Sequence, residues 1–162
     1  MNPNYIIDGY NLIYNIPRFR NSLDSGLEHA RNTLISFTRG YLASYKVKIT
    51  IVFDGDEVGV IENAFLSTRR LKVIYSKPPE KADPVIKKLI RQTSNKKSLF
   101  VVSADNDLIQ FSKQHGAQSL SPEEFYHLAS KHPNHNQMDQ KYNSSVSKEE
   151  VDDWLKLFGE KD

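Results

Sequence analysis

Residues 5–11 read Tyr-Ile-Ile-Asp-Gly-Tyr-Asn, and this stretch near the start of the chain decides the fold. Its bulky and β-branched apolar residues predict a short buried β-strand. Gly9 directly after the strand favours a backbone turn that a residue with a Cβ resists. We therefore expect Asp8 at the carboxyl end of a buried strand, at the mouth of a sheet.

An apolar strand that ends in an acid recurs twice further along the chain. Residues 47–53 predict a second strand, and Asp54 follows it directly. Residues 98–103 include a continuous apolar run, which is typical of a strand covered on both faces. Asp105 and Asp107 come after that strand, so three predicted strands end near a carboxylate.

Strands that alternate with helices predict an α/β fold, a three-layer sandwich around a mostly parallel sheet. Right-handed crossovers place all strand carboxyl ends at one edge, where ligands of such folds bind. The other expected elements are strands at 71–75 and 117–120, helices over roughly 24–45, from Asp83, through 108–111 and from Ser121, and a loop over 12–22.

The end of the chain has a different pattern. Residues 132–146 are polar and without period, which predicts a linker after a domain at 1–131. A capping box at Ser147 opens a short C-terminal helix over 147–162, which carries Trp154 and Phe158. This helix either folds back onto the domain or docks on a protein partner.

The composition excludes several classes of protein. The chain of 162 residues has no cysteine, which excludes disulfides and cysteine-ligated zinc or iron–sulfur sites. No apolar run approaches the roughly 18 residues that span a bilayer, and the start of the chain lacks a secretory signal pattern. We expect a cytoplasmic protein without a membrane segment.

The net charge of +2 hides an asymmetry along the chain. Residues 147–162 hold an excess of acids, so the preceding part of the chain is more basic than the total indicates. A basic surface suits a polyanionic partner. An ordinary balance of solvated charges explains the same count equally well.

The acids at the strand ends point to metal chemistry when they are taken together. Asp83 begins a predicted helix at the same edge as Asp8, Asp54 and Asp105. Like charges at ~4 Å repel by roughly 4 kcal/mol at an effective dielectric near 20, and a divalent cation relieves that repulsion. Oxygen ligands alone favour a hard ion such as Mg²⁺ or Mn²⁺, which suits phosphodiester hydrolysis.

Each of these acids also has a structural interpretation. Asp83 before Pro84 fits a helix N-cap, and Asp54 fits a turn. Asp107 fits a cap of its own helix while Asp105 binds metal. A buried strand leaves Asp8 in need of a partner, so Asp8 is the acid hardest to explain by structure alone.

Four motifs, in this order and spacing, resemble the NYN domains of the PIN-like ribonuclease superfamily, with the YacP-like branch the nearest likeness. They are Asp8-Gly9-Tyr10-Asn11-Leu12, Phe53-Asp54-Gly55, Ala82-Asp83 and Val102-Ser103-Ala104-Asp105-Asn106-Asp107-Leu108. The resemblance covers residues from about 4 to 130 and implies a parallel sheet of order 3-2-1-4-5.

The resemblance implies an endoribonuclease of RNA processing or decay that uses Mg²⁺ or Mn²⁺. It implies RNA as the partner, possible association with ribosomes, and no membrane. Carried over by position, the metal-site acids are Asp8, Asp83 and Asp105; Asp107 joins them as a catalytic acid; and Asn11, Asp54 and Ser103 support them.

One departure keeps a second hypothesis open. Many relatives have another acid directly after the position of Asp83, where this chain has Pro84. A non-catalytic RNA-binding or adaptor domain with a degenerate site is therefore the main alternative. A phosphatase with Asp8 as nucleophile ranks below it, because Tyr10 stands where that chemistry usually needs a second acid.

Basic side chains in loops and near element ends are candidate contacts for the RNA backbone, several of them at the acid-bearing edge. Scattered solvated charges are an equally good explanation for any one of them. The candidates are Arg18, Arg20, Arg69, Arg70, Lys77 and Lys81.

Overall fold

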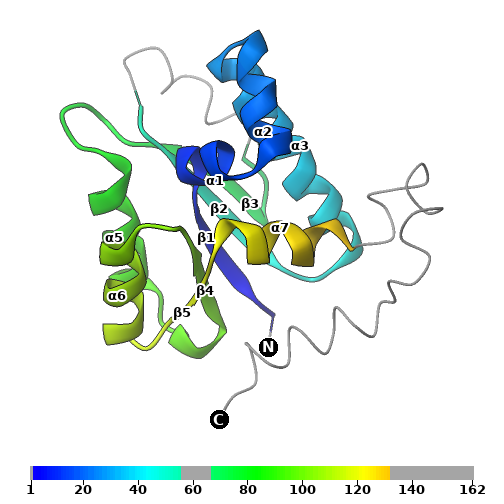
Figure 1. The fold of residues 1–162 in the computed structure, drawn as a ribbon. Helices are drawn as coiled ribbons and strands as arrows, with labels where there is room; N and C mark the ends of the chain where they lie inside the picture. The colour runs from blue at the N-terminus through cyan, green and yellow to red at the C-terminus, as the bar shows by residue number, and fades with distance from the viewer. Residues whose placement is uncertain (1, 56–66, 132–162) are drawn as a thin grey trace.

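A computed structural model describes residues 2–55 and 67–131. Five parallel strands form one sheet in the order β3-β2-β1-β4-β5, with β1 at its centre (Figure 1). The α/β class and the strand order expected from the sequence are both confirmed. The strands are β1 Asn4–Asp8, β2 Lys48–Phe53, β3 Leu71–Tyr75, β4 Leu99–Val102 and β5 Gln118–Leu120.

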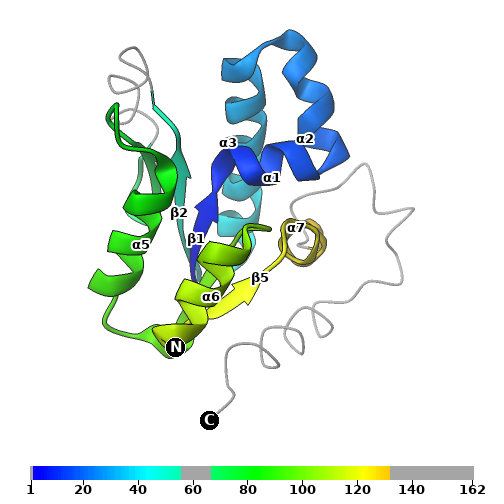
Figure 2. The ribbon, with the colours of Figure 1, turned by 60° about the vertical axis from the view of Figure 1, so that its left-hand side comes forward.

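Helices cover both faces of the sheet and make three layers (Figures 1 and 2). One face packs against α1, α2, α3 and α7, and the other packs against α5 and α6. None of the described helices is long and apolar enough to cross a bilayer. The helices are α1 Gly9–Asn15, α2 Pro17–Ser22, α3 Leu27–Ser44, α5 Ala82–Gln92, α6 Asn106–Gln114 and α7 Pro122–Ser130, with 3-10 turns η1 Leu23–Ser25 and η3 Lys96–Ser98.

The central strand is buried on both faces. Tyr5 and Ile7 point into the core under α1, α3 and α7, whereas Ile6 points into the core under α5 and α6. All three side chains are at most 2% exposed. This double burial explains why the run is continuously apolar rather than alternating.

The loop expected over residues 12–22 is wrong, because α1 and α2 occupy this stretch. Leu12, Ile16 and Phe19 recur at spacings of three and four and are all buried. Pro17 is the first residue of α2, a position where its missing N–H is not needed. The apolar period therefore outweighs the proline as a signal.

Gly9 is required for a different reason from the one expected. It is the first residue of α1 and its backbone does not adopt positive φ. A Cβ on Gly9 would lie 2.4 Å from the Phe53 ring of the neighbouring strand. Close packing of α1 on β2, rather than an unusual turn, thus explains the glycine.

The register of the parallel strands brings their carboxyl ends to one edge. Asp8 pairs with Val52, and Ile7 pairs with Val102. The residues just after β2 and β4 therefore lie beside Asp8. The predicted linker and C-terminal helix, over 132–162, lie outside the described residues, so the domain boundaries stay a prediction.

Candidate functional site

Asp8 is the last residue of β1 and is largely withdrawn from solvent. Its Oδ2 accepts a hydrogen bond from Ser103 Oγ at 3.2 Å. Burial raises the pKa of the Asp8 carboxyl from 3.8 to about 6; the Ser103 hydrogen bond opposes this rise, and Asp54, Asp105 and Asp83 add to it. The predicted convergence of carboxylates on Asp8 is therefore present as an electrostatic interaction.

Ser103 connects Asp8 to the loop that carries Asp105. It is 1% exposed, and its Oγ accepts a hydrogen bond from the Asp105 amide at 3.0 Å. Asp105 is the N-cap of α6, where its Oδ1 accepts from the Asp107 amide at 2.9 Å. Asp105 therefore caps α6, a role that the sequence pattern leaves open to Asp107.

Asn11 holds the same loop from the other side. Its Oδ1 accepts a hydrogen bond from the Ala104 amide at 2.8 Å. Asn11 belongs to α1, so this bond ties the first helix of the chain to the end of β4. Asn11 therefore supports the position of the acids rather than presenting its oxygen to a ligand.

Asp54 organises the start of α5. Its Oδ1 accepts from the amide of Ala82, the first residue of that helix, at 2.5 Å. Asp83 is the second residue of α5, and no described backbone amide donates to it, so the N-cap interpretation of Asp83 is wrong. The Asp54 carboxylate, directly after β2, accepts the amide at the start of α5, so Asp83 is not needed as a cap.

Asp83 has two oxygens in different surroundings. Its Oδ2 lies 3.2 Å from Lys87 Nζ, one turn further along α5. Its Oδ1 is buried and accepts no hydrogen bond from any residue that the structure describes. A buried carboxylate oxygen without a donor is expensive, and a bound cation or water satisfies it.

Lys87 is the residue of this site that the sequence reasoning missed. Its Nζ also lies 2.5 Å from Asp107 Oδ2, so one ammonium joins two acids of different helices. Hydrogen bonds to Asp107 and Asp83 raise the pKa of Lys87. The spacing of four residues between Asp83 and Lys87 is the signal that could have revealed the first of these pairs.

The donor chemistry of the site fits a hard cation, but the acids do not form a closed cage. Within residues 2–55 and 67–131, no three acidic or histidine side chains are close enough together to hold a metal ion. Mg²⁺ needs few protein ligands, because it keeps most of its waters and usually takes one or two carboxylates. The desolvated Asp8 and the orphaned Asp83 Oδ1 meet that lower requirement.

Comparison with known proteins decides the family. The family model described as YacP-like NYN domain matches residues 5–157. The chain belongs to the YacP-like NYN domain family. The match runs past residue 130, where the recognisable motifs end, and includes most of the tail that the sequence motifs left outside the resemblance.

Relatives of this NYN domain come from Bacillus subtilis. The chain is 31% identical over 90 residues to the uncharacterized protein YacP of strain 168, a match that covers 56% of this chain and 52% of that relative. It therefore spans about half the length of that protein. Two crystal structures of Rae1 (YacP), one of a mutant, share the fold with TM-scores of 0.68 and 0.66 at 23% and 22% identity. They cover 97% of this chain, and the chain covers 92% and 94% of theirs.

The YacP-like NYN domains have the PIN-like nuclease fold. The described sheet, with Asp8 at the end of β1 and Asp105 shortly after the neighbouring strand β4, agrees with that fold.

The expected basic contacts of this NYN domain divide between two edges of the sheet. Arg18 and Arg20 lie on α2, beyond the carboxyl end of β1, and Lys77 lies in the loop after β3. Lys81 is the N-cap residue of α5 and belongs to the same edge. The remaining two candidates, Arg69 and Arg70, precede β3 and therefore lie at the opposite edge, away from the acids.

Asp8 makes the stability of this NYN domain depend on pH in a predictable direction. Between pH 3.8 and about 6 the folded state holds more protons on Asp8 than the unfolded state does, so stability falls as the pH rises. We expect this fall to reach roughly 2–3 kcal/mol in metal-free buffer. Urea unfolding across this pH range, for the natural chain and for Asp8→Asn, isolates the effect; a constant difference between the two would contradict it.

Proposed function

We propose that this protein is an endoribonuclease of RNA processing or decay that requires Mg²⁺ or Mn²⁺. The observation that carries the proposal is the desolvated Asp8 carboxyl together with the buried Asp83 Oδ1, which accepts no hydrogen bond from any described residue, at the edge where the strands end. Asp8 is held in a desolvated state next to three other acids, an arrangement that raises the free energy of the folded protein. Such strain is typical of a site that a cation completes.

Asp8 and Asp83 are the residues that would hold the cation, with Asp105 as the third acid. When bound, a hard cation lowers the pKa of a coordinated water and stabilises charge that develops on a phosphate. Ser103 orients the Asp8 carboxylate, and the Asn11 bond to Ala104 fixes the loop that carries Asp105. Asp54 positions the first turn of α5 and with it Asp83.

A non-catalytic RNA-binding domain is the second candidate, and one observation favours it. The described residues contain no ready-made cluster of three metal ligands, in agreement with Pro84 standing where the resemblance to NYN domains implies a second acid. In that case RNA binding would be independent of divalent ions and of Asp8. The same residues would then have only a structural role.

Metal removal separates the two candidates. We expect the purified full-length chain to cut a labelled single-stranded RNA internally in Mn²⁺ or Mg²⁺ and to leave it intact in EDTA, because the acids alone cannot activate water. Gel analysis of the fragments gives the measurement, and addition of excess Mn²⁺ after EDTA serves as the control. Absence of cleavage in every metal, with ribosome-bound RNA included as a substrate, would rule out the endoribonuclease.

A further inference from the structure

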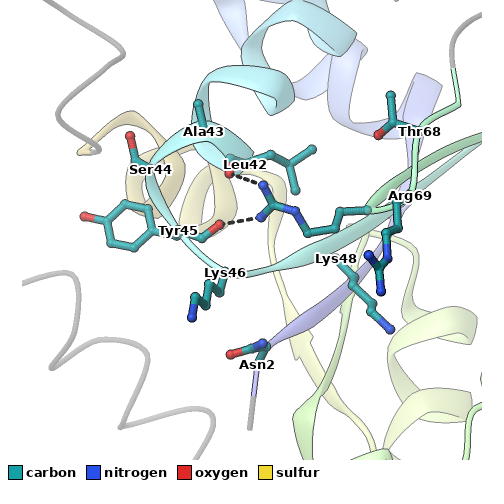
Figure 3. Close-up of a pocket in the computed structure, with 10 residues that line it drawn as sticks. Asn2, Leu42, Ala43, Ser44, Tyr45, Lys46, Lys48, Thr68 and Arg69 are labelled. Carbon is teal, nitrogen blue, oxygen red and sulfur yellow. Dashed lines mark hydrogen bonds between the residues drawn. The ribbon is translucent and has the colours of Figure 1, made fainter.

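A hollow lies at the edge of the sheet opposite the acids. It has a volume of about 1000 Å³ and lies where α3 ends and where β2 and β3 begin (Figure 3). Lys46, Lys48, Arg69 and Arg70 line it together with polar residues such as Asn2. Four cationic side chains therefore surround one concave surface.

A second hollow adjoins the first. It measures about 210 Å³ and shares Lys48, Arg69 and Arg70 with its larger neighbour. It adds Lys72, which follows the start of β3. Within the described parts of the chain, no acidic residue lines either hollow.

Arg70 differs from the other cations because it is committed to the protein. Its guanidinium donates to the carbonyls of Leu42 and Tyr45 at 2.9 Å each (Figure 3). These carbonyls belong to the C-terminal end of α3, where the helix dipole is negative. Arg70 therefore caps the C-terminal end of α3, and its guanidinium is already engaged in hydrogen bonds within the protein.

The other four cations, Lys46, Lys48, Arg69 and Lys72, form a surface that we call the basic trough. All four are exposed, and their side chains form no ion pair or hydrogen bond with any residue that the structure describes. Like charges gathered without counter-charges repel one another, and a polyanion relieves this repulsion while it releases its own counter-ions.

We propose that the basic trough binds the phosphate backbone of RNA at a second contact, remote from the acids; this inference rests on RNA being the substrate of the proposed function. The trough presents charge rather than a surface for bases. Tyr45, the aromatic residue that lines the larger hollow, packs against Tyr41 with ring centroids 5.4 Å apart. Contacts of this kind give affinity and orientation without reading sequence.

The distance between the two edges defines which RNA molecules reach both. β2 has six residues, which at about 3.3 Å per residue separate its ends by roughly 17 Å. A short RNA bound at the acids does not reach the trough, whereas a longer strand passes around the sheet edge to it. The trough should therefore strengthen the binding of long RNA and leave short RNA unaffected.

The test compares two double variants of the full-length chain that remove equal charge. Lys48→Gln with Arg69→Gln removes two trough cations, and Lys88→Gln with Lys113→Gln removes two exposed lysines from α5 and α6. Fluorescence anisotropy with labelled single-stranded RNA of two lengths, in EDTA and over a series of salt concentrations, measures affinity without cleavage. Arg70 is left intact because it caps α3.

We expect the trough variant to bind the long RNA about tenfold more weakly and with a salt slope reduced by about 1.4, since each lost phosphate contact contributes about 0.7. The short RNA and the control variant should behave like the natural chain. Equal affinity and equal salt slope in both variants would overturn the proposal. This is also the result expected if the trough binds an acidic protein instead of RNA.

Failure of the trough and failure of the proposed function give different results. If the trough variant binds long RNA weakly but the natural chain cuts no RNA in Mn²⁺, the trough stands and the endoribonuclease fails. If the natural chain cuts RNA and the trough variant binds like the control, the endoribonuclease stands and the trough fails. With an active enzyme, the trough variant should raise KM for long RNA and leave kcat unchanged.

Discussion

Replacement of Asp8 by asparagine is expected to lower the rate of RNA cleavage in Mn²⁺ by about 10²–10³-fold, the size of a lost contact to a catalytic cation. Asparagine keeps the shape of the side chain and still accepts the hydrogen bond from Ser103 Oγ. Only the negative charge is removed. Initial rates with a labelled RNA under saturating metal measure the effect.

The same substitution should leave the fold intact, which separates a catalytic defect from a folding defect. Asp8 is ionised at pH 7 against the effects of burial and of three neighbouring acids, so its neutral replacement is at least as stable in metal-free buffer. Asp24→Asn, in the exposed turn η1, is the matched control and should keep full activity. Activity of Asp8→Asn close to that of the control would refute the role of Asp8.

Gly55→Ala is expected to destabilise the protein by about 3 kcal/mol, the upper end of the range for overpacking. A Cβ at this position would lie 2.1 Å from the backbone carbonyl oxygen of Ser76 and 3.0 Å from Tyr75 Cβ. A main-chain atom cannot rotate away, so β3 or the end of β2 has to shift. Urea denaturation in metal-free buffer measures the loss.

The control for Gly55→Ala is a glycine with a different requirement. Gly26 has φ of +102° and ψ of 164°, a conformation that is essentially restricted to glycine, and no atom within 4 Å of a Cβ placed on it, so Gly26→Ala meets backbone strain of roughly 1–3 kcal/mol and no clash. Since Gly55 follows Asp54, the shift in Gly55→Ala should also impair the bond from Ala82 to Asp54. A stability loss below about 1 kcal/mol in Gly55→Ala would contradict the steric argument.

Much of the site could be predicted because one simple rule determines where its acids lie. Parallel strands bring their carboxyl ends to one edge, so Asp8, Asp54 and Asp105 could be grouped without any coordinates. The strand order itself did not follow from the residues; it entered through the resemblance to NYN domains. The contact of Asp8 with Ser103 depends on β1 and β4 being neighbours. That neighbouring position is therefore predicted only through the resemblance.

The roles of the individual acids could not be predicted, because each role depends on a partner distant in sequence. The sequence leaves Asp83 equally open to a capping role and a metal-binding role, whereas in the structure Asp54, which follows β2, accepts the amide at the start of α5. The opposite locations of Lys77 and Arg69 likewise depend on where β3 begins and ends, which charge spacing does not reveal. Local pattern identifies the polar residues but does not assign their contacts.

Lys87 affects how Asp83 would bind a cation. Its ammonium lies between Asp83 and Asp107 as a built-in counter-ion. A divalent ion held by Asp83 would compete with this ammonium for the carboxylate, so its binding would be an exchange of one cation for another. Exchange changes the local charge less than simple addition does, so metal binding at this NYN domain should respond only weakly to ionic strength.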